Sequence, residues 1–516
     1  RGFLQLRLEL GAWGRVLMNE SDCLEQPSAD PHYKWKVLAT VAMGATMATL
    51  DASITNIAFP VLTEVFQAEL TTIMWVTLAY ILVSTSSMLL VGKISDHIGR
   101  KRIYALGMAL FSLGLLFCSI SQNIEQLVFS RAFQALGAAM TVACGTALVT
   151  EAFPLGEIGR GLGLLGVAVS FGFILGPVVG GFLLDWFDWR AIFYVRLPIG
   201  VITFFMAAFL LKEGRRKPGR LHLDILGALT SSGGLFCLVF GVSQLRRYGI
   251  HSPLVHILIG SGLLIFIVFI WVERRAYDPI VDLELFKNRT FSSASAALFL
   301  VFAAAPAHIL IMPFYLMQGI LLNPSRAGLL LAVHSVTTMI FGPISGWLSD
   351  RFGPSRFAIL GAAALASAFF LMRSFEIQTP VAVIVPVLIL SGIGVGAFQA
   401  PNNSMIMGGV PGNRLGTASA LIATLRQVGI SVGMAIAGTV FAARQAAYEL
   451  GFAEAGEPVS HAARLAIPPA FHEVLLISGS LVVLVIVFSI LGAPWGKKAS
   501  PYRFPASGSA GSSTGD

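Results

Sequence analysis

The segment Gly92-Lys-Ile-Ser-Asp96-His-Ile-Gly99-Arg100-Lys-Arg102 decides the fold, because the chain carries its pattern twice. The second copy is Gly346-Trp-Leu-Ser-Asp350-Arg-Phe-Gly353-Pro-Ser-Arg356. Both copies follow G-x-x-S-D-x-x-G, continue with basic residues and come directly after a long apolar segment. Weak internal symmetry of this kind is common in membrane transporters. The two copies therefore predict an internal repeat built from several helices.

Working outward from these copies, the chain consists mainly of apolar segments long enough to cross a bilayer. A hydrocarbon core of about 30 Å requires about 20 apolar residues in helix. Fourteen segments meet that length: residues 37–60, 71–91, 103–121, 125–151, 159–184, 191–211, 223–243, 254–272, 291–317, 326–348, 357–374, 381–406, 415–443 and 471–493. Only 12% of residues are charged, against about 25% in soluble domains, and the mean hydropathy is +0.78. The sequence predicts an all-α integral membrane protein with 14 transmembrane helices.

The distance between the two copies predicts how the helices are grouped. Without the seventh and eighth spans, the remaining residues between the copies have a natural length for six spans. We therefore expect two six-helix halves, residues 34–211 and 276–495, separated by a two-helix insertion, residues 212–275. Residues 1–33 form an expected N-terminal extension that lacks the apolar run of a signal peptide. The Gly/Ser-rich end, residues 496–516, is expected to be a disordered tail.

The basic residues predict the orientation. From residue 31 onward every lysine, and most arginines outside the spans, fall on the side that carries the two repeated loops. Loops rich in Lys and Arg stay in the cytoplasm. Both termini are therefore expected in the cytoplasm, with the chain crossing a bacterial cytoplasmic (inner) membrane many times. The net charge of +8 is then explained by the basic loops that set the membrane topology, and no nucleic-acid partner is expected.

Four motifs resemble the major facilitator superfamily, and in particular its fourteen-span drug:proton antiporters. The resemblance covers residues 34–495. The motifs are residues 92–102, Arg131-Ala-Phe-Gln134-Ala-Leu-Gly137, Gly172-Phe-Ile-Leu-Gly176-Pro177-Val-Val-Gly180-Gly181, and Leu50-Asp51-Ala-Ser-Ile-Thr-Asn56-Ile-Ala-Phe-Pro60. The first resembles the superfamily signature, the second the proton-coupling motif, the third the motif of antiporters, and the fourth the drug exporters.

The resemblance also implies roles for individual residues. It implies proton coupling for Arg131 and Gln134, and for the span 5 glycines with Pro177 a seal against substrate leak. The alternative for span 5 is plain helix packing through small residues. A further match, residues 189–200, departs from the family at Arg196, where the family usually has Asn. We expect this departure to alter a contact on the outer side, at the start of span 6.

Ionisable groups within the spans mark the candidate transport site. Such a group costs at least about 2.5–3.5 kcal/mol in the hydrocarbon and is functional by default. Away from the span ends, Asp51, Arg131 and Arg426 stand out. Helical rise places Asp51 and Arg131 near one level, in the outer half of the membrane, so an ion pair between them is possible. We expect Asp51 to bind and release protons; the alternative is a fixed pair that only joins spans 1 and 4.

Several other polar residues within the spans are candidates for the substrate cavity. Arg426 has two possible roles, contact with an anionic or polar group, including Asp51, or satisfaction by carbonyls of neighbouring helices. The remaining candidates are Gln399, Asn402, Asn403, His308 and His334. For each of them the alternative is a structural hydrogen bond between helices.

The repeated loops are expected to take part in gating. Gly92 and Gly99 permit close approach and a sharp turn, and Asp96 can accept hydrogen bonds at the N-terminus of a neighbouring helix. The alternative is that the basic residues act only as topological signals. The candidate gating residues are Gly92, Asp96, Gly99, Arg100, Arg102, Gly346 and Asp350.

These observations favour a proton-driven exporter of drugs or other small amphiphilic compounds. The chain lacks the P-loop G-x-x-x-x-G-K-[ST], so ATP is not the expected energy source. We expect no enzymatic activity and no cofactor or metal; the expected partners are the bilayer, protons, a small-molecule substrate and, through the outer loop 444–470, an adaptor protein of the periplasm. The alternatives are a proton-coupled uptake carrier for a small metabolite and a membrane-embedded enzyme or receptor.

Overall fold

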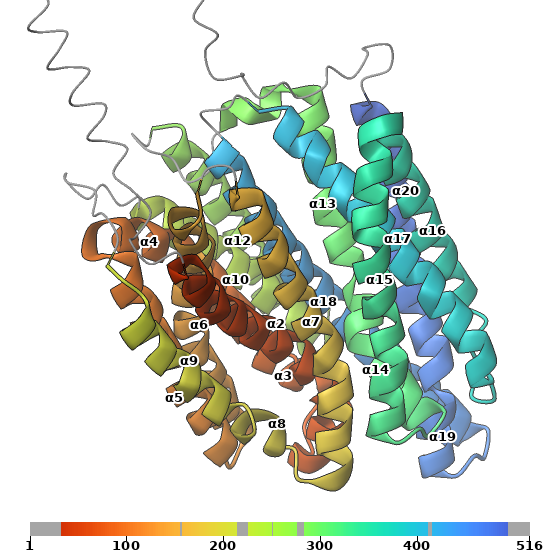
Figure 1. Ribbon diagram of the computed structural model, residues 1–516. Helices are drawn as coiled ribbons and strands as arrows, with labels where there is room; N and C mark the ends of the chain where they lie inside the picture. Colours follow the sequence, from red (N-terminus) through yellow and green to blue (C-terminus); the bar gives the residue numbers. More distant parts are fainter. Residues whose placement is uncertain are drawn as a thin grey trace, which may run out of the picture.

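The computed structural model describes residues 32–154, 157–213, 225–249, 251–275, 283–410 and 415–493. Within these ranges the chain forms helices joined by short connections, and no strand occurs (Figure 1). Fourteen of the helical segments are long and apolar enough to cross a membrane. The predicted fold class and helix count are confirmed.

The first half begins with α2 (Tyr33–Phe66), the first spanning helix. The helices that follow it in this half are α3 (Leu70–Ile73), α4 (Trp75–Ile98), α5 (Arg100–Ile120), α6 (Ile124–Ala152), α7 (Ile158–Trp186), α8 (Ala191–Tyr194) and α9 (Leu197–Leu210). The short helices α3 and α8 continue into α4 and α9, so each pair forms one span.

The insertion and the second half complete the bundle. The insertion consists of α10 (Ile225–Ser243), α11 (Leu245–Tyr248) and α12 (Pro253–Glu273). The second half consists of η2 (Leu283–Lys287), α13 (Arg289–Ala304), η3 (Ala307–Ile311), α14 (Met312–Phe314), η4 (Tyr315–Gly319), α15 (Pro324–Phe352), α16 (Pro354–Met372), α17 (Val381–Gly408), α18 (Leu415–Glu454), α19 (Val459–Leu465) and α20 (Ile467–Gly492). The segments η3 and η4 are π-helical. Helices α2 to α9 lie on one side of the bundle and α13 to α17 with α20 on the other (Figure 1), while α10 packs on both α4 and α18.

The segment expected to be an outer loop, residues 444–470, is instead largely helical. Helix α18 continues to Glu454, and α19 covers Val459–Leu465. Ala, Arg, Gln and Glu are good helix formers, so the helix runs beyond the apolar stretch. The hydropathy of the sequence shows where a helix leaves the hydrocarbon core of the membrane. It does not show where the helix itself ends, so the sequence predicts a loop for this extension.

The two repeated motifs end their helices in the same way. The backbone N–H of Gly99 donates to the carbonyl of Ser95, and the N–H of Gly353 donates to that of Ser349, both at 2.9 Å. Both glycines have positive φ, +116° and +92°, a conformation that glycine adopts at low cost. The repeat seen in the sequence is therefore also a repeat of backbone geometry. We call the end of the bundle that carries these two loops the motif end.

Helix α7 packs closely on both halves through its glycines. A Cβ at Gly176 would lie 1.8 Å from the hydroxyl of Ser53 on α2, and one at Gly181 would lie 2.4 Å from the carbonyl of Pro324 at the start of α15. From the other side, a Cβ at Gly328 of α15 would lie 2.1 Å from the carbonyl of Pro177. Small residues allow this approach where lipid provides no hydrophobic drive for packing. We call the contact between α7 and α15 the α7–α15 seam.

We expect Gly181→Ala to weaken the α7–α15 seam. The added methyl group meets backbone on a facing helix, and overpacking of this kind costs about 1–3 kcal/mol. The measurement is the apparent melting temperature of the purified protein in detergent, which should fall by several degrees. Gly166→Ala on the same helix is the matched control, because no atom lies within 4 Å of its added Cβ. Equal melting temperatures for the two variants would contradict the seam.

Candidate functional site

Asp51 lies in the middle of α2 and is completely buried. Arg131 of α6 is also completely buried, and its Nη1 donates to both carboxylate oxygens of Asp51, at 2.9 and 2.7 Å. The structure thus brings together the two residues for which the sequence made a pair possible. A charge buried in hydrocarbon is tolerable only when it is paired in this way.

Arg196 is the third charged member of this cluster. It lies where α8 meets α9, is 2% exposed, and donates from Nη1 to Oδ1 of Asp51. Its Nε donates to the carbonyl of Ile192 at 2.5 Å. The sequence led us to expect an altered contact on the outer side; in the structure the side chain points into the protein, where it contacts Asp51. The available signal was an arginine with apolar neighbours on both sides in the sequence, at the position where the family usually has Asn.

Three further residues, Gln134, Val76 and Tyr80, contact one or more of the three charged side chains. Gln134 accepts from Arg131 at 2.8 Å and donates to Asp51 at 3.1 Å. Nε of Arg131 donates to the carbonyl of Val76 on α4, and its guanidinium lies 4.4 Å from the ring centroid of Tyr80. We call these three charged residues together with Gln134 the Asp51 cluster.

The charge balance of the Asp51 cluster is unequal. With Asp51 ionised, two guanidinium groups face one carboxylate, which leaves a net charge of +1. Nη2 of Arg131 and Nη2 of Arg196 are buried and have no hydrogen-bond partner among the residues that the structure describes. Loss of the carboxylate charge would leave two arginines unpaired in a buried place, which is strongly unfavourable. The present arrangement therefore depends on the ionised acid.

At the motif end two of the candidate gating residues pair with acids of neighbouring segments. Arg100 pairs with Glu151 at 2.6 Å, and Arg102 pairs with Glu213 at 3.2 Å. A Cβ on Gly99 would overlap the Glu213 carboxylate, which is the flexible end of its side chain and can move, so the positive φ is what favours glycine there. The side chain of Asp96 lies outside the described part of the structure.

In the second half the gating candidates are Gly346 and Asp350. A Cβ on Gly346 would lie 3.7 Å from that of Ala400, and Asp350 is exposed. Gly92 of the first copy has no atom near the place of its missing Cβ. Next to this end, Lys34 donates a hydrogen bond to Glu157 and thereby lowers the pKa of that carboxyl group.

His308 and His334, considered separately from the sequence, lie against each other in the structure. Their ring centroids are 4.3 Å apart. Nδ1 of His334 lies 2.8 Å from the hydroxyl of Ser391 on α17, while Nδ1 of His308 is buried without a partner. The pair joins the first, second and fourth helices of the second half.

Three candidates lie on α17, on either side of Pro401. Asn402 donates to the carbonyl of Ala294 on α13 at 3.0 Å, which is the structural hydrogen bond considered as its alternative. Asn403 has a buried Oδ1 without a partner, and Gln399 is half-buried.

Arg426 lies on α18 and has no acidic partner within the described ranges. Its guanidinium lies 5.2 Å from the ring centroid of Phe302 on α13, and its Nε is buried without a hydrogen bond. Asp51, one possible partner, is occupied by Arg131 and Arg196. The other possibility, satisfaction by backbone carbonyls, is likewise not observed among the described residues. The side chain is half-buried, so part of it remains open to a ligand.

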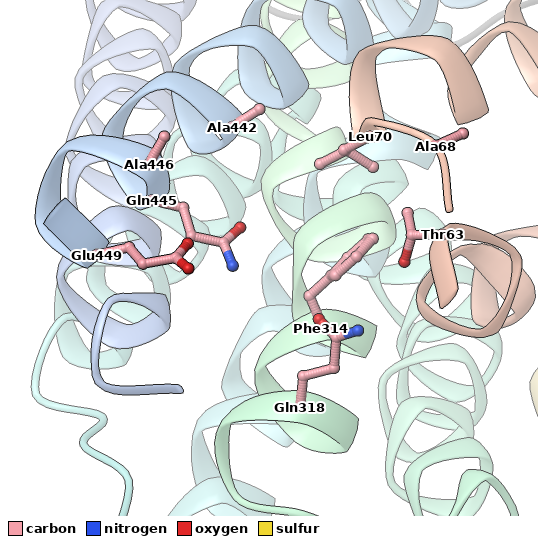
Figure 2. Close-up of a pocket in the computed structure, with 9 residues that line it drawn as sticks. All are labelled: Thr63, Ala68, Leu70, Phe314, Gln318, Ala442, Gln445, Ala446 and Glu449. Carbon is pink, nitrogen blue, oxygen red and sulfur yellow. The ribbon is translucent and has the colours of Figure 1, made fainter. Parts of the chain in front are cut away.

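A hollow of about 190 Å³ opens at the end opposite the motif end (Figure 2). It lies where both halves meet, with Thr63 and Leu70 on one side, Phe314 and Gln318 on another, and Gln445 and Glu449 on α18. None of the candidates from the sequence lines it.

The halves are tied together beside the hollow. Gln318 donates to Glu64 at 3.0 Å. The backbone N–H of Ser325 donates to Asp185 at 3.0 Å, which places an acid of the first half at the N-terminus of α15. A carboxylate is favourable at a helix N-terminus. The halves are thus in polar contact at this end of the bundle.

Comparisons with known proteins agree with this architecture. The chain is 33% identical to the riboflavin transporter RibZ of Clostridioides difficile over 79% of this chain and 88% of the relative. It is 31% identical to the multidrug resistance protein Stp of Mycobacterium tuberculosis over 79% of this chain and 75% of the relative. The crystal structure of a bacterial homologue of the human lysosomal transporter Spinster, inward-facing and unoccupied, superposes with a TM-score of 0.69. That match covers 90% of this chain and 98% of the other at 15% identity, so it supports the fold alone.

The family assignment follows from the matched length. The family model described as Major Facilitator Superfamily matches residues 41–434 and 294–504. Together these ranges cover nearly all of both halves. Other relatives include a tetracenomycin C resistance and export protein of Streptomyces glaucescens, 26% identical over 80% of this chain and 76% of the relative. The chain is a multi-pass membrane transporter, not an enzyme, and belongs to the Major Facilitator Superfamily.

Proposed function

We propose that this transporter exchanges protons for drugs or other small amphiphilic compounds and exports them across the bacterial cytoplasmic membrane. The observation that carries this proposal is the Asp51 cluster, an acid buried between two arginines in the interior of the first half. Ionisable groups at such a depth mark proton and ion pathways in membrane proteins. In this proposal both termini and the motif end face the cytoplasm.

The geometry supplies a link between the proton and the helices. Asp51 belongs to α2, Arg131 to α6, and Arg196 to the junction of α8 and α9. A proton on Asp51 removes the charge that holds both guanidinium groups. The arginines must then find other partners or water, which requires the three helices to shift. Protonation and helix arrangement are thereby coupled, as proton-driven exchange requires.

Export is supported by the names of relatives, among them a tetracenomycin C resistance and export protein. A riboflavin transporter is among the relatives as well. Uptake of a small metabolite is therefore the second candidate, and the same acid would serve it. Substrate contacts in either case include Arg426, and the loops of the motif end take part in gating.

We expect Asp51→Asn to abolish transport driven by a proton gradient. The amide has the shape of the acid but cannot exchange a proton. The measurement uses inverted membrane vesicles, acidified inside by respiration, and follows accumulation of two fluorescent probes, ethidium and riboflavin.

Asp51→Glu is the matched variant for this test, because it retains an acid and should retain part of the transport. Asp188→Asn, an exposed acid at the surface, should behave as wild type. Gradient-driven accumulation by Asp51→Asn at the wild-type rate would remove Asp51 from the coupling role. Accumulation only in right-side-out vesicles would show uptake instead of export.

We expect Arg196→Gln to destabilise the protein less than Asp51→Asn. Removing Arg196 leaves one guanidinium with one carboxylate, whereas removing the acid leaves two cations without a counter-charge. Loss of one partner from a buried pair costs about 3–5 kcal/mol. The double variant Asp51→Asn with Arg196→Gln leaves only one unpaired cation. Its apparent melting temperature in detergent should therefore be higher than that of Asp51→Asn alone. A double variant that is less stable than both single variants would show that charge balance does not hold the cluster together.

We expect Arg426→Ala to weaken binding of a transported compound that carries an acidic or polar group. A hydrogen bond to a charged group contributes about 1.5–3 kcal/mol, or roughly a 10- to 100-fold change in affinity. The measurement is the half-saturating concentration for transport, with Arg426→Lys retaining part of the affinity. An unchanged value for every transported compound would assign Arg426 a structural role.

A further inference from the structure

We propose that His308 and His334 form a second proton-binding site, in the second half, at the place that corresponds to the Asp51 cluster in the first. This inference rests on the proposed proton-coupled function and adds to it. The exporter would then hold one proton site in each half of its repeat. Three independent features carry the inference: the contact between the rings, the register of the repeat and the backbone around His308.

The hydrogen bonds leave basic nitrogens on both rings. The hydroxyl of Ser391 donates to the carbonyl of Leu388 at 2.8 Å. Since a serine has a single proton to donate, this arrangement makes Nδ1 of His334 the donor to Ser391 and leaves Nε2 basic; with the hydroxyl turned toward the ring, Nδ1 is the acceptor instead. Nδ1 of His308 is buried without a partner in a side chain that is 6% exposed. A buried polar atom without a partner calls for an explanation. Binding of a proton at this nitrogen is one such explanation, because histidine titrates near neutral pH.

The repeated motifs give the register for the second helix of each half. Tyr80 stands twelve residues before Gly92 on α4, and His334 stands twelve residues before Gly346 on α15. Tyr80 faces Arg131 in the Asp51 cluster. His334 therefore occupies, in the second half, the position of a residue that faces the proposed proton site in the first.

The fourth helix of each half supports the same correspondence between the histidine pair and the Asp51 cluster. Gln134 is ten residues past the start of α6, and Ser391 is ten residues past the start of α17. Packing confirms this register. Three residues beyond Gln134, Gly137 lies against the backbone of Phe111; three residues beyond Ser391, Gly394 lies against that of Leu365. Gln134 and Ser391 thus each bond to an ionisable side chain from an earlier helix of the same half.

The first helix of each half places His308 one turn from the position of Asp51. Gly172 of α7 lies against the carbonyl of Thr46 and the N–H of Leu50, directly before Asp51. In the same way Gly429 of α18 lies against the carbonyl of Phe299 and the N–H of Ala303. Ala304 therefore corresponds to Asp51, and His308 follows it by four residues, about one turn further along the same span.

The backbone around His308 departs from a regular α-helix. Residues Ala307–Ile311 are π-helical, directly after Pro306. Short π-helical segments within helices are frequently found at functional sites. The wider turn turns the imidazole of His308 toward α15, where the ring of His334 lies at 4.3 Å.

The pair lies apart from the other ionisable groups that neighbouring helices contribute. On α20, His472 bonds to the carbonyl of Phe375, and Glu473 pairs with Arg444. Beyond the π-helical segment, Tyr315 donates to the carbonyl of Glu376.

The remaining neighbouring helices contribute no acid to the pair. On α2 the nearest acid is Asp51, which is held by its arginines. On α18 the intramembrane ionisable group is Arg426, which lies against Phe302. Helix α17 has no ionisable residue, and those of α15 other than His334 stand at its ends. A charge on the pair therefore has no acidic partner from these described helices, so a proton is held there only in an arrangement that brings water or a counter-charge to the rings.

Two imidazolium rings at this distance repel each other, so the pair binds a single proton. Binding moves one proton onto a ring nitrogen and leaves no other bond changed. The ring that becomes charged donates from both nitrogens, and the present tilted contact between the rings then gives way. The second half would thus respond to a proton by a change of its own helix contacts.

The experiment measures proton binding directly and requires no substrate. The full-length protein, with ¹³C-labelled imidazole rings, is placed in lipid nanodiscs, and infrared difference spectra are recorded between pH 8 and pH 5. We expect the wild type to gain one imidazolium signal that both His308→Gln and His334→Gln lack. His256→Gln, an exposed histidine on α12, is the control and should retain that signal. Ser391→Ala should shift the pH at which the signal appears.

The outcomes separate this inference from the proposed function. If neither histidine variant changes the number of imidazolium signals, the pair binds no proton and the proposal of a second proton site is refuted. Proton-driven transport that depends on Asp51 would stand in that case. If both histidine variants fail to fold, an unchanged titration in the Ser391→Ala protein would refute the site, and a shifted one would support it.

Discussion

A carboxylate inside a bilayer survives only with a counter-charge, and in this protein the counter-charge ties helices together. Asp51 on α2 is held by Arg131 of α6 and by Arg196 between α8 and α9. The three elements are far apart in the sequence, so the cluster fixes how the first half is packed. The excess of one positive charge makes this arrangement sensitive to the state of a single acid. A structural anchor would be expected to balance its charges, whereas a switch benefits from an imbalance.

The fold was predictable because the bilayer sets a length that the sequence must meet. Fourteen apolar segments and two copies of one loop motif led to the correct fold class and helix number. The repeated loop motif has the same positive-φ geometry at Gly99 and Gly353, while the grouping into two halves and an insertion stays a prediction. The helical extension of α18 to Glu454 was not predicted, because beyond the hydrocarbon only helix propensity, and no longer hydropathy, carries the information.

The candidate site was predictable only in part, for a physical reason. Depth along a helix is set by residue number, so the level of Asp51 and Arg131 could be worked out. Direction around the helix and breaks between helices depend on packing, which hid Arg196 at the junction of α8 and α9. The contact between His308 and His334 was hidden for a similar reason, because a π-helical segment changes the register that an ideal helix would give.

Helix α7 offers a physical route from the acid to the contact between the halves. One of its faces lies on α2 around Asp51, where Gly172 meets the backbone of Leu50 and Gly176 meets Ser53. Another face forms the α7–α15 seam, where Pro177 and Gly181 meet backbone of the second half. Contacts this close have little room to deform, since only backbone and the short side chains of Thr49 and Ser53 lie between the helices at these glycines. A shift of α2 caused by a change at Asp51 must therefore move α7 or open one of its two contacts, and either result alters the seam between the halves.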